Sequence, residues 1–216
     1  MPLKHRLQLA VATDLVVFAF VEGVLSILLI RRGHEPFTGV WALPGGFLKG
    51  GETLAACAAR ELYEETALCA RHLDQISAFA EPGRDPRGDV ISIAYCALVR
   101  AEDCEIAAGS DAAAAQWWAV NGLPELAFDH DEIALDARQR LRKGLYVDRR
   151  VYALLPDKFT SAQVQSLFEA ISGGGLDKRN FQSWLRKSGQ LKEVGELRRG
   201  AHRPAKLYEL KPETGN

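Results

Sequence analysis

The first clear pattern in the chain is a pair of apolar segments, Thr13–Val21 and Val24–Arg31, which are rich in Val, Ile, Leu and Phe. Only Glu22-Gly23 separates them, and this arrangement predicts a β-hairpin. Later apolar segments predict more strands and a helix. The strands are predicted at Gln75–Glu81, Val90–Arg100 and Gln116–Val120, and Gly109–Ala115 is predicted to be a loop. The helix runs from Phe128 to about Lys143, with Ile133, Leu135, Ala137 and Leu141 on its inner side.

A helix is also predicted over Thr53–Thr66, because Thr53 follows a Gly-Gly turn and Ala, Leu and Glu fill most of the segment. Strands therefore stand before and after a central helix, and a second helix closes the set. This order predicts an α+β fold in which an α/β/α sandwich encloses a mixed sheet.

The last third of the chain changes to helical periodicity. Apolar residues recur at helical spacing after Thr160, a good N-cap, and Gly173-Gly174-Gly175 ends this helix. Asp177 caps a second helix that runs to about Lys187. Two strands joined by the basic sequence RRGAHRP follow, at Leu191–Leu197 and Ala205–Leu210. Helix, turn, helix and hairpin predict a small winged helix-turn-helix domain.

We therefore expect two domains, residues 1–147 and residues 148–216. The connection Asp148–Lys158 is short and contains four apolar side chains, Val151, Tyr152, Leu154 and Leu155. Because these residues favour burial, we expect the connection to pack the two domains together and not to act as a flexible tether.

The charge differs between the two parts. Residues 1–145 carry 14 Lys or Arg and 20 Asp or Glu, a net charge of −6. Residues 146–216 carry 13 Lys or Arg and 8 Asp or Glu, a net charge of +5, so the two parts nearly cancel to the total of −1. An acidic body with a basic tail suggests two partners of opposite character.

Composition excludes several classes of protein. The four cysteines, Cys57, Cys69, Cys96 and Cys104, have no C-x-x-C spacing, so buried free thiols are expected, not a zinc site or a disulfide framework. The apolar segment near the N-terminus is interrupted by Thr13 and Asp14 and lacks a clean cleavage site. No segment is long and apolar enough to span a bilayer, so we expect a cytoplasmic protein without a membrane partner.

The segment Gly46–Leu68 contains the densest chemistry. On its predicted helix, Glu61, Glu64 and Glu65 are three and four residues apart and project from one face. Carboxylate oxygens are the ligands that Mg²⁺ or Mn²⁺ prefers. Arg60 and Glu52 can pair to hold the preceding loop against the helix, and the glycines let a carbonyl join the metal shell.

This segment resembles the Nudix box, G-x5-E-x7-R-E-U-x-E-E-x-G-U with U aliphatic, and it departs from the pattern only at Ala67. The resemblance implies a Nudix fold and a catalytic set of Glu52, Arg60, Glu61, Glu64 and Glu65. It implies that Glu61, Glu64, Glu65 and the carbonyl of Gly46 hold Mg²⁺ or Mn²⁺. The alternative is an amphipathic helix with a solvated acidic face.

Other candidate ligand contacts lie outside the box. Arg84 and Arg87, in the loop Pro82–Asp89, suit phosphate or ribose, or are ordinary exposed turn residues. Four aromatic residues could stack on an adenine, although core packing suits at least two of them. These aromatic residues are Trp41, Phe47, Trp117 and Trp118. A separate set of residues could supply a general base outside the box, namely Glu81, Asp85, Asp89 and Asp111. We expect Asp129 to cap its helix and His130 not to be catalytic.

The candidate DNA contacts form two groups. One group lies at the start of the predicted recognition helix, and the other lies around the hairpin tip, where a wing contacts the DNA backbone. They are Lys178, Arg179 and Asn180, and Arg198, Arg199, His202, Arg203 and Lys206. The alternative is a protein-interaction module with a solvated basic rim.

The order of these parts, the RDPRG loop, the FDH helix start and the HRPAKLYEL ending resemble one group of Nudix proteins. These are ADP-ribose-pyrophosphatase-like proteins with a C-terminal winged helix, including NAD-responsive transcriptional regulators. The resemblance implies a homodimer that binds a nucleoside diphosphate derivative such as ADP-ribose, hydrolyses it, and binds a double-stranded DNA operator. The alternatives are a plain pyrophosphatase whose tail serves dimerisation, and a sugar-sensing regulator.

Overall fold

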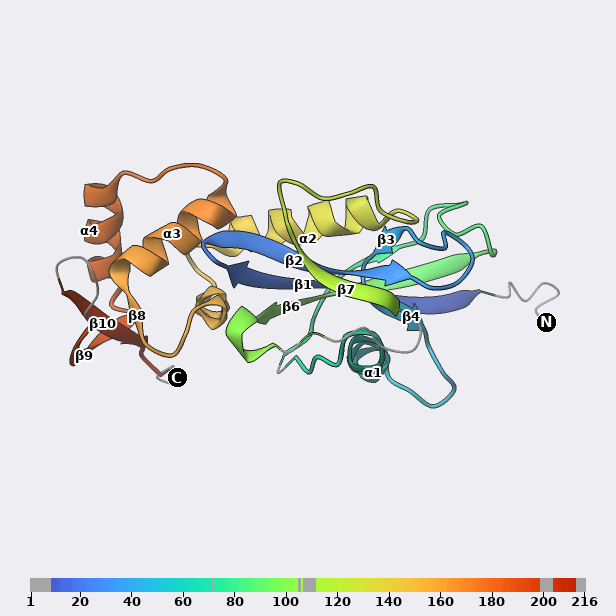
Figure 1. Cartoon of the computed structure of the whole chain (residues 1–216), viewed down its shortest axis with the longest axis horizontal. Coiled ribbons are helices and arrows are strands. Elements are labelled where there is room, and N and C mark those ends of the chain that lie inside the picture. The colour runs from blue at the N-terminus through green and yellow to red at the C-terminus, as the bar shows by residue number, and fades with distance from the viewer. Residues whose placement is uncertain (1–8, 71, 105, 107–111, 199–203, 213–216) are drawn as a thin grey trace, which may run out of the picture.

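The structure is a computed structural model that describes residues 9–70, 72–104, 106, 112–198 and 204–212. An N-terminal part with a large sheet is followed by a smaller C-terminal part, and α3 lies beside α2 where they meet (Figure 1). No helix in the described part of the chain is both long enough and apolar enough to cross a bilayer.

The large sheet is mixed and is built on the predicted hairpin. Strands β1 (Ala10–Val21) and β2 (Val24–Arg32) are antiparallel and joined at Glu22-Gly23, where both residues have positive φ. Strand β6 (Val90–Val99) runs parallel to β1 on its other side. The remaining strands are β5 (Asp74–Phe79) beside β6, β3 (Trp41–Ala42) and β7 (Ala112–Ala119) beside β2, and β4 (Gly45–Phe47) beside β1.

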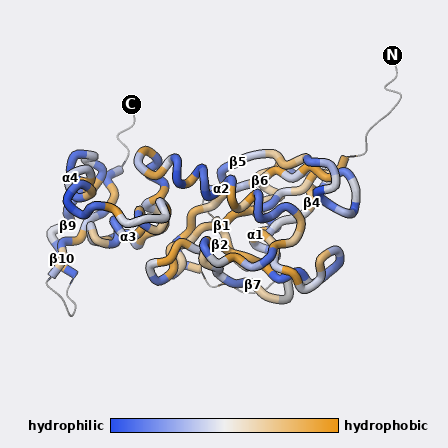
Figure 2. The backbone as a smooth tube through the Cα atoms, turned by 90° about the horizontal axis from the view of Figure 1, so that it is seen from above, coloured by the Kyte–Doolittle hydropathy of each residue, from blue (hydrophilic) through white to orange (hydrophobic). Residues whose placement is uncertain are grey.

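Two helices cover opposite faces of this sheet (Figure 1), α1 (Leu54–Thr66) on one and α2 (His130–Gly144) on the other. Because side chains alternate along a strand, β1 supplies both layers: Leu15 and Val17 pack on the α1 side, and Val16 and Phe18 pack on the α2 side. Hydrophobic residues accordingly gather in the central strands, as Figure 2 shows. The predicted α/β/α sandwich with a mixed sheet is confirmed.

The C-terminal part has the order expected of a winged helix. Helix α3 (Ser161–Ser172) begins with a capping box between Thr160 and Gln163 and ends at the left-handed Gly173. Helix α4 (Lys178–Ser188) begins at Asp177, whose side chain accepts a hydrogen bond from the backbone of Asn180. A small sheet completes the domain, with strands β8 (Phe159–Thr160), β9 (Leu191–Arg198) and β10 (Ala205–Leu210).

The connection between the parts is packed, as its apolar residues predicted. It forms a 3-10 helix, η2 (Arg149–Leu154), in which Val151, Tyr152 and Leu154 are buried. One hydrophobic cluster runs from Phe18 of the large sheet through these residues to Phe168 of α3. The two parts therefore share a continuous core.

Several predictions need correction. Strand β7 starts at Ala112, although a loop was expected to Ala115, because these alanines pair with the end of β2; residues 107–111 lie outside the described residues. On α2, Ile133 and Ala137 are buried as predicted and Leu141 is partly buried against the core, but Leu135 is 55% exposed, and His130 and Ala134 are buried as well. The four cysteines are free; Cys57 is buried as predicted, whereas Cys96 and Cys104 are only partly buried and Cys69 is exposed.

Candidate functional site

The turn before α1 depends on glycine because other atoms lie against it. A Cβ at Gly46 would lie 2.4 Å from the carboxyl carbon of Glu61, and one at Gly45 would lie 2.2 Å from the carbonyl oxygen of Thr13. Real side chains do not tolerate such distances, so the glycines let β4 pair with β1 while α1 packs directly on the turn. Ala67 ends α1 with φ 60°, the left-handed conformation in which the box pattern has glycine.

Arg60 lies among the carboxylates of the box. Its Nε is 2.5 Å from Glu52 Oε1, and its Nη1 is 2.5 Å from Glu61 Oε1 and 3.0 Å from Glu64 Oε2. The expected pair of Arg60 and Glu52 is thus confirmed, and it holds the loop against α1. The hydrogen bond from Arg60, with one from the backbone N–H of Lys49, lowers the pKa of Glu52 to about 2.

Glu65 is the buried member of the acidic face, with 8% of its surface exposed. Its Oε2 accepts a hydrogen bond of 2.9 Å from the backbone N–H of Gly45. Burial is the main cause that raises the pKa of Glu65 to about 8; the negative charges of Glu61 and Asp14 act in the same direction, and the hydrogen bond from Gly45 opposes them. The shift therefore reflects the buried position of Glu65 first and the neighbouring carboxylates second.

The donor set fits a hard divalent cation, since oxygen ligands come from three carboxylates on one helix face. In the described part of the chain, however, no three His, Cys, Asp or Glu side chains converge as a metal cluster. In this arrangement Arg60 holds Glu61 and Glu64 in ion pairs. Metal binding at these glutamates would exchange those ion pairs for coordination.

Two adjoining cavities, of about 60 and 380 Å³, form a cleft over the box. Both are lined by Arg32, Gly45, Gly46, Phe47 and Arg87. The larger one also reaches the three box glutamates, and the smaller one reaches Asp14, Arg84, Asp85, Phe128 and His130. The structure thus brings the predicted ligand contacts Phe47, Arg84 and Arg87 to one cleft beside the box.

Arg87 is held between aromatic rings and a carboxylate. Its guanidinium carbon lies 4.6 Å from the ring centre of Phe47 and 5.3 Å from that of Phe128, and its Nη2 is 2.6 Å from Asp85. Arg32 covers the same Phe128 ring at 4.9 Å. Burial and the like charge of Arg87 lower the pKa of Arg32, so an anion between the two arginines would relieve an unfavourable interaction.

Sequence reasoning missed Arg32 and Phe128. Arg32 ends an apolar strand, and a charged residue at a strand end beside the box could have been noticed. Phe128 was taken only as the start of a helix, but it has φ 57° and packs edge-on against Phe37 at 4.8 Å. Its left-handed backbone aims the ring at the cleft, which no local pattern indicates.

Arg84 is buried, not an exposed turn residue, with 5% of its side chain accessible. Its Nε and Nη2 donate to both carboxylate oxygens of Asp129, at 2.8 and 2.6 Å. Asp129 occupies the N-cap position of α2 as predicted, but its side chain makes no capping hydrogen bond. The carboxylate is used to fix Arg84 at the cleft.

Asp14, which the sequence analysis noted only because it interrupts the N-terminal apolar segment, lies between Arg84, Ser92 and His130 at the cleft. Its Oδ2 accepts a 2.5 Å hydrogen bond from Ser92, and its Oδ1 lies 3.4 Å from His130 Nε2. Burial alone raises the pKa of Asp14, but His130, Ser92 and Arg84 together outweigh it, so the pKa is below its ordinary value. His130 Nδ1 accepts from the backbone N–H of Leu43, so the histidine orients the glycine turn and is not exposed for catalysis.

The other candidates are placed less centrally. Asp85 lines the cleft but is bound to Arg87, whereas Glu81 and Asp89 are exposed and Asp111 lies outside the described residues. Three of the four candidate aromatic residues, Trp41, Trp117 and Trp118, pack against the hydrophobic core. Only Phe47 faces the cleft.

In the C-terminal part, Lys178, Arg179 and Asn180 are exposed on the first turn of α4, while Phe181 and Leu185 anchor the other face in the core. Of the residues expected around the wing, Arg198 is exposed, and Lys206 lies 2.9 Å from Glu193. The remaining wing candidates, Arg199, His202 and Arg203, lie outside the described residues.

Comparison with known proteins agrees with both parts of the structure. Residues 9–138 match the family model of the NUDIX domain, and residues 151–210 match that of the NrtR DNA-binding winged helix domain. The chain belongs to the NrtR-type Nudix family. Both the predicted family and the predicted winged helix are thereby confirmed. Below, the Nudix part denotes residues 9–138 and the winged helix part residues 151–210.

Three relatives illustrate the likeness. The chain is 33% identical over 201 residues to an ADPR responsive transcriptional repressor of Acinetobacter baylyi, covering 90% of this chain and 79% of that protein. It is 43% identical over 135 residues to an ADP-ribose pyrophosphatase of Methanocaldococcus jannaschii, covering 62% and 76%. The crystal structure of Shewanella oneidensis NrtR with a 27mer DNA is 31% identical, with a TM-score of 0.80 over 93% of each chain.

Proposed function

We propose that this protein is a transcriptional repressor whose Nudix cleft binds ADP-ribose and whose winged helix binds a double-stranded operator. The observation that carries the proposal is that one continuous core joins a nucleotide-sized cleft to an exposed basic helix. The full-length likeness to an ADPR responsive repressor supports it, as does a solved complex of the Nudix domain of S. oneidensis NrtR with ADP ribose.

In this proposal, Arg32 and Arg87 hold the diphosphate, because guanidinium groups suit phosphate oxygens and both lie over the Phe128 ring at the cleft. Phe47 and Phe128 offer ring faces for the adenine. Arg84 is the less direct contact, since Asp129 already satisfies two of its N–H groups. When the ligand binds, its phosphate would replace Asp85 as the partner of Arg87.

At the other end of the chain, Lys178, Arg179 and Asn180 would enter the major groove, and Arg198 and Lys206 would lie near the DNA backbone. We place the domain boundary at residues 147–148 and infer a homodimer, since palindromic operators match two-fold symmetric proteins. Genes of NAD metabolism are the expected targets.

Ligand binding is expected to release the operator. Helix α2 begins at the cleft with His130 and contacts α3 of the winged helix, so a shift at the cleft can move the recognition helix. Two half-sites must lie about 34 Å apart, or a multiple of that, so a small rotation of each winged helix weakens binding. A coupling of about 1–3 kcal/mol would change operator affinity about 5- to 150-fold.

The test is a titration of ADP-ribose into the protein–operator complex without metal, using Glu64→Gln to prevent turnover. We expect operator affinity to fall as ADP-ribose saturates the protein. Arg87→Gln should abolish that response while leaving basal operator affinity intact. If affinity stays constant although calorimetry shows ADP-ribose bound, the coupling model is wrong for this ligand.

A second activity, hydrolysis of ADP-ribose to AMP and ribose 5-phosphate, is favoured by the complete set of box carboxylates and by the likeness to a pyrophosphatase. Nudix hydrolases depend on a divalent metal, and here we propose Mg²⁺ or Mn²⁺. Glu61, Glu64, Glu65 and the carbonyl of Gly46 would hold it. The metal would neutralise phosphate charge and activate water, while Arg60 and Glu52 keep the loop and helix in place.

A further inference from the structure

Helix α2 runs from the cleft over the box (the nucleotide cleft) to the winged helix part. Phe128, two residues before the helix, lies in the cleft with its ring centre 4.9 Å from the guanidinium carbon of Arg32 and 5.3 Å from that of Arg87. At a rise of about 1.5 Å for each residue, the 15 residues of α2 extend roughly 22 Å to a contact with α3. One rigid element therefore reaches from one part to the other.

The cleft end of α2 is held by tertiary contacts. His130 is the first residue of the helix, and its Nδ1 accepts a 2.9 Å hydrogen bond from the backbone N–H of Leu43. Its Nε2 lies 3.4 Å from Asp14, and its ring centre lies 5.1 Å from that of Phe128. A ligand that displaces the Phe128 ring or the turn at Leu43 therefore acts on the first turn of α2.

The far end of α2 contacts the recognition helix through an aromatic ring. Tyr146, two residues after α2, packs edge-on against Trp184 of α4, with ring centres 5.1 Å apart and planes at 89°. It packs in the same way against Phe168 of α3, at 5.5 Å and 72°. Because edge-on rings prefer this geometry, Trp184 follows a displacement of Tyr146. Trp184 lies one turn after Asn180, so the first turn of α4 moves with it.

Strand β2 takes a similar course but has less freedom to move. It extends from a contact with α3 to Arg32 in the cleft. Hydrogen bonds join it to β1 on one side and to β7 and β3 on the other, so it cannot shift without disrupting the sheet. Helix α2 is held on the face of that sheet by its side chains. Helix shifts of about 1–2 Å are a common form of ligand-driven change.

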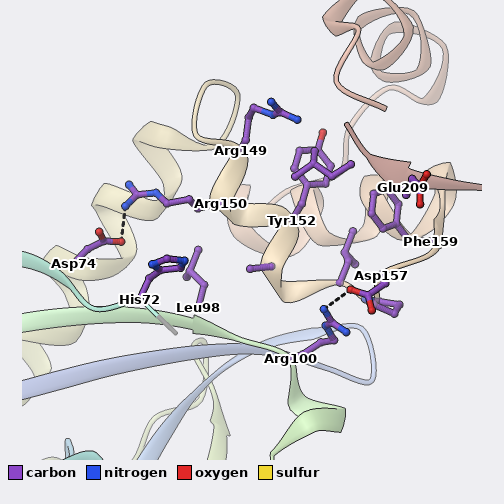
Figure 3. A pocket seen from close by; sticks show the side chains of 14 residues that line it. His72, Asp74, Leu98, Arg100, Arg149, Arg150, Tyr152, Asp157, Phe159 and Glu209 are labelled. Carbon is purple, nitrogen blue, oxygen red and sulfur yellow. Dashed lines mark hydrogen bonds and ion pairs between the residues drawn. The ribbon is translucent and has the colours of Figure 1, made fainter. Parts of the chain in front are cut away.

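The two parts leave space between them for such a shift. A cavity of about 530 Å³ lies between β5 and β6 on one side and η2 and β10 on the other (Figure 3). Two ion pairs bridge the cavity walls, Arg100 with Asp157 at 2.7 Å and Arg150 with Asp74 at 2.5 Å, as the dashed lines in Figure 3 mark. Asp157 and Arg150 are exposed, so these ion pairs oppose a small rotation only weakly.

We propose that Tyr146 is the positioning residue that transmits the ligand state of the nucleotide cleft from α2 to Trp184 of the recognition helix. The inference rests on the proposed function, because it requires a ligand in the cleft and DNA on α4, and it adds the contact that couples them. Tyr146 does not line the cleft, and it is 47% exposed, so replacing it leaves the ligand site and most of the core in place.

The test measures the dissociation constant of ADP-ribose by calorimetry, with and without saturating operator DNA. The parent protein is the full chain carrying Glu64→Gln, without metal. Because coupling is reciprocal, its two constants should differ by about 5- to 150-fold. Tyr146→Ala should bring them within about twofold of each other and leave the constant without DNA unchanged. Tyr146→Phe keeps the ring and should keep the full ratio.

Val147→Ala is the matched control, since it shortens the neighbouring side chain, which is 80% exposed, and should keep the ratio. If Tyr146→Ala lowers the melting temperature, Tyr146→Leu restores apolar volume without the ring and should still lose the ratio. A parent ratio that survives in both variants overturns the role of Tyr146 and leaves the proposed function standing. Loss of the ratio in Tyr146→Phe or in Val147→Ala also overturns that role. Equal constants in the parent protein overturn the proposed coupling itself, and the role of Tyr146 with it.

Discussion

The nucleotide cleft and the exposed face of α4 hold their cations in opposite ways. In the cleft, Arg84 and Arg87 are each bound to a carboxylate at 2.6 Å, and the side chain of Arg84 is almost fully buried. On α4, Lys178 and Arg179 are exposed and form no ion pair with a described residue. The cleft is therefore organised before a ligand arrives, whereas α4 presents solvated charges on its exposed face.

This difference predicts different responses to mutation and salt. A substitution in the cleft removes one partner from a buried network and leaves the other uncompensated, so it costs stability as well as binding. A substitution on α4 removes only a solvated charge, so it costs DNA affinity alone. The predictions below test this contrast from the largest expected effect to the smallest.

Asp14→Asn should destabilise the protein by about 2–4 kcal/mol at pH 7, because it removes the charge on which His130, Ser92 and Arg84 converge. Denaturant unfolding measures this, and Asp131→Asn, at an exposed position of α2, is the control.

The effect also has a pH signature. The pKa of Asp14 is lower in the folded state, so its stabilisation is present above the unfolded value, near 3.8, and is lost as the pH falls through the folded pKa. The difference between mutant and wild type should therefore shrink in acid. A difference that is the same at pH 7 and in strong acid would contradict the assignment of a charged Asp14.

Glu64→Gln should lower the rate of ADP-ribose hydrolysis with Mg²⁺ or Mn²⁺ by roughly a hundredfold or more, about 2.7 kcal/mol, because it removes one ligand charge and keeps the shape. Glu132→Gln, an exposed glutamate in the first turn of α2, should leave the rate unchanged. If the wild type turns over no nucleoside diphosphate derivative, the hydrolase proposal fails while the ligand-sensing proposal stands.

Arg179→Ala should weaken operator binding by about 1–3 kcal/mol without changing the stability of the fold, in contrast to the cleft mutants. Lys178→Ala should reduce the slope of log affinity against log salt by about one, as expected for one lost phosphate contact. Fluorescence anisotropy at several salt concentrations measures both. Arg142→Ala, which is exposed on α2, should change neither value, and an equal effect there would point to non-specific charge.

The smallest effects compare two N-caps, one in each part. Thr53 accepts from Ala56 N at the start of α1, and Thr160 accepts from Gln163 N at the start of α3, so replacing either by Ala should cost about 1 kcal/mol. Because the core is continuous, both variants should lower the protection of β1 and of α4 together in hydrogen exchange. Loss confined to the mutated part would show that the two parts unfold separately.

Much of the architecture follows from the sequence because it depends on local patterns. Alternation along β1, the caps Thr53 and Thr160, and the glycine at 173 each act within a few residues. The spacing of Glu61, Glu64 and Glu65 places them on one helix face whatever lies around them. These local features are enough to predict the sandwich, the winged helix and the acidic face of the box without knowledge of any tertiary contact.

Tertiary structure alone decided how the cleft is built. Arg84 binds Asp129 across 45 residues, Ser92 binds Asp14 across 78, and the Leu43 backbone binds His130 across 87. No local periodicity encodes such pairs, because they depend on which strand and helix ends meet at one edge of the sheet. For the same reason, no local pattern predicts that Arg32 and Phe128 line the cleft. Leu135 is exposed because the packing of α2 against the sheet and α3 decides which of its faces is buried.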